Sequence, residues 1–199
     1  MAGLATLGRI FDEHRVRLEA MIDRRLDPAL RARTSSKDIL QDAYILAKSR
    51  WPDFQRRLQS GSLTGSGPST FSWLYRLSLD ALIDAWRKHS SGPRDVRREM
   101  PLPESSTMQL GCNLIEPGAG PATQFQLAEV RELVRKAMAK LKDSDREILW
   151  MRKGDQLSFS EISEVLEITV NVASVRFTRA LRRLGKIWQE LYPDFGSTL

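Results

Sequence analysis

Residues that form disulfides or bind metals are nearly absent from this sequence. Only one of its 199 residues is cysteine, Cys112, so no disulfide can form within the chain. Its two histidines, His14 and His89, lie far apart and match no spacing typical of a zinc site. We therefore expect a protein without disulfides, without bound metal and without a cofactor. A lone cysteine such as Cys112 is far more often without a redox role than an oxidant sensor.

Long apolar runs are also missing. No segment approaches the ~20 apolar residues of a membrane-spanning helix. The apolar run at the amino terminus, within MAGLATLGRI, is too short for a signal peptide. We expect no membrane span and a cytoplasmic location.

Catalytic patterns are missing as well. Residues 60–70, SGSLTGSGPST, are rich in glycine but lack the lysine followed by Ser or Thr that a phosphate-binding loop needs. Asp84 is a single acid in a basic segment, whereas a metal-dependent nuclease needs clustered carboxylates. We therefore do not expect an enzyme.

What the sequence does have is enough apolar content to fold and an excess of positive charge. Hydrophobic residues make up 41% of the chain, which allows real cores. Lys and Arg together number 31 against 25 for Asp and Glu, a net charge of +6. A basic protein suits a partner rich in phosphate, although many basic proteins bind no nucleic acid.

Periodicity divides the chain into two helical segments. Residues 90–122 are rich in Gly, Pro and Ser and have no sustained apolar period, which is typical of a linker. The flanking segments, 5–89 and 123–193, show the 3.6-residue period of amphipathic helices, and no strand-type alternation competes with it. The sequence therefore predicts an all-α protein of two small helical domains joined by a flexible linker.

The same period predicts where the helices lie. In the first domain we expect helices at 7–26, from Ser36 to about Arg50, and at 71–88, the last capped by Ser69 or Thr70. In the second domain we expect a helix at 123–141 and another that begins with a capping box at Ser144–Glu147. A short helix should begin with a second capping box at Ser158–Glu161 and end at Leu166. The final helix should be capped by Thr169 and end near Leu191.

The last two predicted helices fit a helix-turn-helix, in which the second helix enters the major groove of DNA. The expected buried positions are Ile162, Val165, Leu166, Ile168, Ala173, Phe177 and Leu181. The expected outward positions are Asn171, Ser174, Val175, Thr178 and Arg179, and Arg176, Arg182 and Arg183 can neutralise phosphates. The alternative is an amphipathic hairpin with a solvated basic face, which any helical bundle can contain.

An aromatic segment marks the end of the first domain. FSWLYRLSLDALIDAWRKH combines the aromatics Phe71, Trp73, Tyr75 and Trp86 with Arg76, Arg87 and Lys88. Aromatic faces beside cations can stack unpaired bases, but aromatics at helical spacing more often belong to a core. Trp73 and Tyr75 are two positions apart, roughly 200° on an α-helix, so at least one should lie outside the core.

Two motifs together resemble the sigma-70 family. SSKDILQDAYILAKSRWPDF and TFSWLYRLSLDALIDAWRKH resemble its region 2, and the second domain resembles region 4. The order of region 2, linker and region 4, without region 3, is similar to that of extracytoplasmic-function (ECF) sigma factors. The resemblance implies a non-catalytic specificity subunit of bacterial RNA polymerase. Region 2 would bind the β′ clamp helices and open the -10 element, and region 4 would bind the β flap and the -35 element.

The resemblance also implies roles for single residues. Asp38, Gln41 and Asp42 occupy the D-x-x-Q-[DE] positions that meet core polymerase, although helix capping and solvated charge also explain them. The W-L-Y-R match assigns the unpaired -10 strand to Trp73, Tyr75 and Arg76, with Asp80, Arg87 and Lys88 nearby on the same helix. The recognition-helix match assigns the double-stranded -35 element to Ser174, Arg176, Thr178 and Arg179. The pattern of α-helical faces adds Asn171, Val175 and Arg183 to the same predicted surface.

The chain departs from the family pattern at three places. Asp80 stands where many relatives have asparagine, and an ionised carboxylate accepts hydrogen bonds but donates none, so the -10 preference is expected to differ. The connection from Phe54 to Phe71 is longer than usual, and its role is not carried over. Residues 172–175, VASV, replace the common T-V-[KR]-S and remove a basic residue.

The sequence leaves an alternative function and a possible protein partner undecided. The alternative function is a helix-turn-helix regulator that binds duplex DNA without joining polymerase, although the chain has no evident sensor domain or dimer interface. Sigma factors of this type are often held by an anti-sigma factor, which a flexible linker would permit, but no residue identifies one.

Overall fold

The computed structural model describes residues 2–26, 28–59, 69–89 and 133–193. All regular secondary structure in these ranges is helical, which confirms the predicted all-α fold class. The described residues form two compact units, one containing α1 to α4 and the other α7, η1, α9 and most of α8. The predicted linker at 90–122, with Cys112, and most of the Gly/Ser segment at 60–70 lie outside the described residues.

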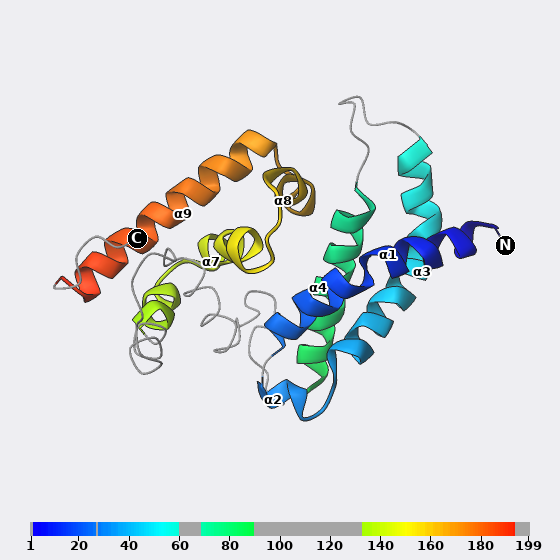
Figure 1. Ribbon diagram of the computed structural model, residues 1–199, viewed down its shortest axis with the longest axis horizontal. Helices are drawn as coiled ribbons and strands as arrows, with labels where there is room; N and C mark the ends of the chain where they lie inside the picture. Colours follow the sequence, from blue (N-terminus) through cyan, green and yellow to red (C-terminus); the bar gives the residue numbers. More distant parts are fainter. Residues whose placement is uncertain (1, 27, 60–68, 90–132, 194–199) are drawn as a thin grey trace. The chain divides into compact units, whose positions relative to one another are not determined.

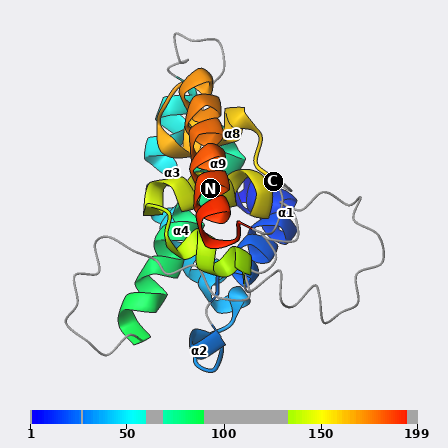
Figure 2. The ribbon, with the colours of Figure 1, turned by 90° about the vertical axis from the view of Figure 1, so that its left-hand side faces the viewer.

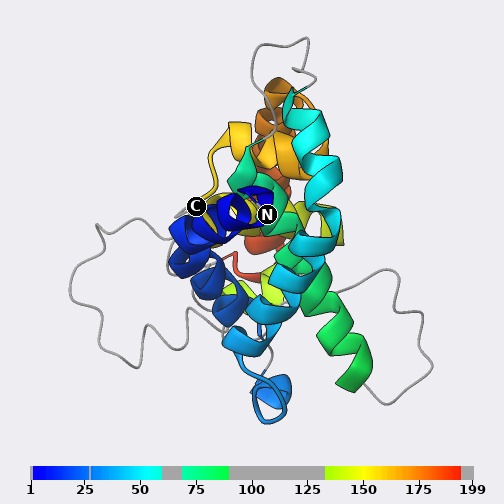
Figure 3. The same ribbon diagram turned by 90° about the vertical axis from the view of Figure 1, so that its right-hand side faces the viewer.

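The first unit is built from three long helices. These are α1 (Ala2–Arg25), α3 (Ser36–Gln59) and α4 (Thr70–His89), and each packs against the other two (Figures 1 and 3). The single turn α2 (Pro28–Arg31) lies between α1 and α3 in the sequence and was not predicted. The core between the long helices is apolar and includes Leu18, Ile22, Ile39, Ala43, Leu74 and Leu82.

Helix α3 continues beyond its predicted end near Arg50. It runs through Pro52 to Gln59, although proline lacks an N–H and costs a helix one backbone hydrogen bond. Ala47, Trp51 and Phe54 are all buried and follow one another at helical spacing. Burial of two aromatic side chains stabilises the last turns enough to offset the lost hydrogen bond.

The second unit contains a short helical segment at 133–139, α7 (Asp143–Leu149), η1 (Trp150–Gly154), α8 (Phe159–Leu166) and α9 (Val170–Leu191), with α7 packed against α9 (Figure 2). The first ten residues of the helix predicted at 123–141 lie outside the described residues. Ile148, Leu149 and Met151 are buried as expected.

One of the two predicted capping boxes is present. Ser158 and Glu161 form it reciprocally: the Ser158 N–H donates to Glu161 Oε2 at 2.7 Å, and the Glu161 N–H donates to Ser158 Oγ at 3.1 Å. The box predicted at Ser144–Glu147 is wrong. Helix α7 begins at Asp143 with Lys142 as its N-cap, so Ser144 already lies within the first turn and no side chain caps the helix.

Element η1 is a π-helical turn that the sequence did not reveal. A Cβ atom on Gly154 would lie 2.8 Å from Cε2 of the fully buried Trp150, closer than packed atoms tolerate. Glycine therefore lets the backbone pass close to the indole, and the wider turn ends there.

Candidate nucleic-acid interface

A tight turn joins α8 and α9 into a helix-turn-helix. Glu167 ends α8 with a left-handed φ of 54°, and the Ile168 N–H donates to the Ser163 carbonyl at 2.9 Å. Thr169 caps α9 as predicted, because its Oγ1 accepts from the Val172 N–H at 3.3 Å. The turn and cap thereby set the direction in which α9 leaves α8.

Apolar contacts then hold the two helices together. Ile162 and Ala173 are fully buried, and the rings of Phe159 and Phe177 meet edge to face with centroids 5.7 Å apart. The buried face of α9 consists of Ala173, Ala180, Leu184 and Trp188. Four residues that we expected inside are only half-buried: Leu166, Ile168, Phe177 and Leu181. For Leu181 the reason is that Ala180 occupies the inward position at that level.

The opposite face of α9 carries most of the residues predicted to bind the -35 element. Asn171, Val175, Arg176, Thr178 and Arg179 are exposed, and Ser174 is half-buried. The Thr178 hydroxyl donates to the Ser174 carbonyl at 3.0 Å, within the helix itself. The structure thus brings these side chains onto one accessible surface.

Arg183 differs from the other predicted contacts. Its Nη1 donates to both carboxylate oxygens of Asp145 on α7, at 2.8 and 2.7 Å. The Asp145 side chain is only 10% exposed. Arg183 therefore joins α9 to α7, whereas Arg176 and Arg179 form no ion pair with any carboxylate in the described ranges.

In the first unit, Trp73 is the aromatic side chain placed to meet a ligand. Its half-buried ring stacks on Phe54 with centroids 4.1 Å apart and an interplanar angle of 10°. Trp51 lies 5.9 Å from both rings and is buried. A base that stacks beside Trp73 would extend an aromatic arrangement that already exists.

Tyr75 does not belong to that surface. The side chain is completely buried, and its hydroxyl oxygen accepts a 2.9 Å hydrogen bond from Nη2 of the buried Arg25. In this structure Tyr75 therefore offers the -10 strand no exposed surface, and its predicted contact with that strand stays a prediction. The expectation that Trp73 and Tyr75 face different ways is confirmed.

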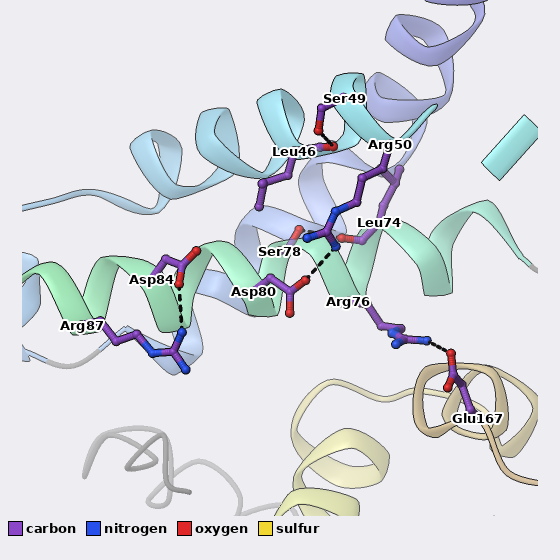
Figure 4. Close-up of polar contacts among 10 residues, drawn as sticks. All are labelled: Leu46, Ser49, Arg50, Leu74, Arg76, Ser78, Asp80, Asp84, Arg87 and Glu167. Atoms are coloured by element: carbon purple, nitrogen blue, oxygen red, sulfur yellow. Dashed lines mark hydrogen bonds and ion pairs between the residues drawn. The ribbon is translucent and has the colours of Figure 1, made fainter. Parts of the chain in front are cut away.

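The remaining predicted -10 residues are exposed on α4. Lys88 is exposed, and the other three form ion pairs: Arg76 with Glu167 at 2.5 Å, Asp80 with Arg50 of α3 at 3.2 Å, and Arg87 with Asp84 at 3.3 Å (Figure 4). Sequence reasoning missed Arg50, because the predicted helix ended there. The continued apolar spacing at Trp51 and Phe54 was the signal that α3 runs on and carries Arg50 beside α4.

The predicted polymerase-binding residues share one face of α3. Asp38, Gln41 and Asp42 are all exposed and stand at positions i, i+3 and i+4. Asp38 also caps the helix, since its carboxylate accepts from the hydroxyl and N–H of Ser35 at 2.7 and 3.0 Å. These hydrogen bonds, the side-chain one first, lower the pKa of Asp38. A groove of about 380 Å³ between α1 and α3 adjoins this face and is lined in part by Arg15, Lys37, Asp38 and Gln41.

The chain matches the family described as Sigma-70, region 4, over residues 131–184. It is 24% identical to the ECF RNA polymerase sigma factor SigW of Bacillus subtilis over 156 residues, which cover 78% of this chain and 76% of SigW. The chain is therefore similar to ECF sigma factors of the sigma-70 family over most of its length. The region 4 match covers the helix-turn-helix of this chain and the helices before it.

Two further similarities are more distant or shorter. The ECF RNA polymerase sigma factor SigM of Bacillus subtilis is 29% identical over 117 residues, which cover 58% of this chain and 63% of SigM. A solved structure of CnrH in complex with the cytosolic domain of CnrY is 19% identical, with a TM-score of 0.49, and the match covers 96% of this chain and 90% of that chain.

Among the described residues, no three His, Cys, Asp or Glu side chains gather as a metal site would require. No described helix has both the length and the apolar composition to cross a membrane.

Proposed function

We propose that this chain is a sigma factor, which binds core RNA polymerase and directs it to promoters through two separate DNA-binding surfaces. The observation that carries the proposal is the exposed face of α9, where Arg176 and Arg179 stand free of described carboxylates on the second helix of a helix-turn-helix. Such a face can place cations on phosphates and short side chains on base edges in the major groove. The duplex -35 element is its proposed target.

The first unit supplies the proposed -10 surface. Trp73 presents a half-exposed ring, and Arg76 is exposed one turn further along α4. Opening a duplex requires no covalent chemistry, because unstacking a base costs a few kcal/mol and stacking on an aromatic side chain returns about 1–3 kcal/mol. Arg87 and Lys88, both exposed at the end of α4, supply positive charge for the backbone of the same strand.

Asp80 is proposed to act together with Arg50 rather than alone. The ion pair at 3.2 Å uses one carboxylate oxygen and leaves the other as an acceptor, while it holds the guanidinium beside α4 (Figure 4). Both groups are about half exposed, so a nearby base or phosphate can reach them. The -10 preference is therefore expected to depend on both residues.

Core polymerase is proposed to bind the acidic face of α3. Asp38, Gln41 and Asp42 are exposed together, and a basic partner helix would find two carboxylates there. The cap formed by Asp38 uses one carboxylate oxygen, Oδ2, and leaves Oδ1 for a partner. Capping and partner binding are thus compatible. Such a chain would work in the cytoplasm, and an anti-sigma protein that covers these faces would keep it inactive.

The direct test is transcription with purified components. Core polymerase mixed with the full chain should initiate at promoters mapped from RNA 5′ ends after overexpression, and core alone should not. The double change Arg176→Ala with Arg179→Ala should abolish -35-dependent initiation but keep core binding. The change Asp38→Ala with Asp42→Ala should weaken core binding itself.

A matched control is Arg9→Ala, which removes an exposed arginine from α1 and should change neither property. If the chain bound promoter duplexes alone but never associated with core polymerase, the regulator alternative would replace the proposal.

A further inference from the structure

Two exposed valines stand at the start of the recognition helix. Val172 and Val175 are each 39% exposed, although valine is a residue that folding usually buries. They are three positions apart and are therefore neighbours on the surface of α9. Neither belongs to the buried face formed by Ala173, Ala180, Leu184 and Trp188. Their exposure thus has no explanation in the packing of α9.

Val172 and Val175 lie on the same face of α9 as Arg176 and Arg179. At about 100° per residue, Val172, Val175, Arg176 and Arg179 fall within an arc of roughly 100°. The valines occupy the amino-terminal part of this face, and the arginines continue it toward the carboxyl terminus. Arginines that contact phosphates orient this face toward the groove, and the residues near the start of a recognition helix are those that contact base edges.

Valine offers a base edge nothing but apolar contact. Along the major groove the bases present hydrogen-bond donors and acceptors, and the one apolar group among them is the C5-methyl of thymine. Resting on that methyl removes apolar surface of both groups from water, whereas resting on an amino or carbonyl group would desolvate it without a partner. We infer that Val172 and Val175 read thymine methyl groups in the -35 element. This inference rests on the proposed function.

The chain contains a matched control for the experiment. Val170 is also exposed, at 49%, and lies in the same first turn of α9. It precedes Val172 by two positions, about 200° around the helix, and so faces away from the shared surface. Val170→Ala therefore removes the same side chain from the same turn without touching the proposed reading face. Alanine suits exposed helix positions, so all three variants should fold.

The test uses holoenzyme assembled from core polymerase and the full chain. The -35 sequence that this holoenzyme prefers is first selected from random duplex sequences placed upstream of a fixed -10 element. Each thymine in the selected element is then replaced by deoxyuridine, which removes the methyl and leaves the pairing edge unchanged. For the unmodified protein we expect about fourfold weaker binding at one or two of these positions, the effect of one buried methyl group.

The variants assign the effect to the valines. In the double variant Val172→Ala with Val175→Ala, the same deoxyuridine replacements should not weaken promoter binding further. In Val170→Ala they should still weaken it about fourfold. If every thymine were insensitive, or if the double variant lost as much as the unmodified protein, the inference would be overturned while initiation by the holoenzyme still stood. If no holoenzyme formed with core, the proposed function and the inference would both fail.

Discussion

Nη1 of Arg183 on α9 lies 2.8 and 2.7 Å from the two carboxylate oxygens of Asp145 on α7. The carboxylate is nearly buried, whereas the arginine side chain is about half exposed. This ion pair ties the recognition helix to the helix that packs behind it. A cation that the sequence suggests for DNA phosphate therefore has a partner within the fold.

Arg183→Ala is expected to lower the free energy of unfolding by about 1–2 kcal/mol. The change leaves the Asp145 carboxylate buried without its charged donor, and the partial exposure of the pair reduces the cost below that of a fully buried ion pair. Urea denaturation of the full chain measures the effect. A double-mutant cycle with Asp145→Ala should show coupling between the two residues, and strictly additive losses would contradict the finding.

Salt dependence should separate Arg179 from Arg183. Each phosphate contact contributes about 0.9 to the slope of log binding constant against log salt concentration. We expect Arg179→Ala to reduce that slope by about one contact for the holoenzyme on its promoter. Arg183→Ala, measured where the protein is folded, should keep the original slope, so an equal reduction in both variants would argue against the ion pair as its main role.

Trp73 and Tyr75 are expected to respond in opposite ways. Trp73→Ala should weaken holoenzyme binding to a promoter with an unpaired -10 strand by about tenfold, because base stacking is worth about 1–3 kcal/mol. Trp73→Phe should retain much of the binding. Tyr75→Phe removes one hydrogen-bond acceptor of Arg25 and should lower stability by about 1 kcal/mol without weakening that binding. A binding defect in the stable Tyr75→Phe protein would show that Tyr75 becomes accessible in the complex.

The cap at Asp38 predicts a dependence on pH. Hydrogen bonds from Ser35 lower the pKa of Asp38 in the folded state, so its stabilising effect is present above the unfolded pKa of about 3.9 and disappears as the pH falls through the lower folded value. Thermal unfolding of the unmodified protein and Asp38→Asn should therefore differ near neutral pH and converge in acid, once the pH has fallen through the folded pKa of Asp38. In a Ser35→Ala background, Asp38→Asn should have a smaller effect at neutral pH. A difference between the proteins that persisted in acid would point to a cause other than this carboxylate.

The turn between α8 and α9 holds Glu167 in the left-handed region with a φ of 54°. Glycine adopts this conformation without the steric cost that an L-residue meets, about 1–2 kcal/mol. Glu167→Gly should therefore be more stable than Glu167→Ala by about 1 kcal/mol, a comparison in which both variants lose the same side chain. Equal melting temperatures for the two variants would indicate that the turn relaxes.

Local signals were strong where helices begin at polar caps. Ser158 with Glu161, and Thr169 before Val170, are placed as predicted, because a cap depends on residues within one turn of each other. The capping box predicted at Ser144 is absent because α7 begins one residue earlier, at Asp143, so that Ser144 lies within the helix and cannot be its N-cap. The end of α3 was missed because burial of Trp51 and Phe54 against other helices outweighs the local effect of Pro52.

The sequence alone determined the helical class, the helix-turn-helix and the resemblance to sigma factors, because each depends on residue types at short, regular spacings. Only the tertiary structure decided which member of a matched motif is available to a partner. In W-L-Y-R the backbone geometry separates the half-exposed Trp73 from the fully buried Tyr75, and Arg25, fifty positions earlier, occupies the tyrosine hydroxyl. Among the arginines of α9, Asp145 on another helix engages Arg183, whereas Arg176 and Arg179 pair with no carboxylate in the described ranges. Partners so distant in sequence meet only when the chain folds, so the spacing of residues along α9 does not predict these contacts.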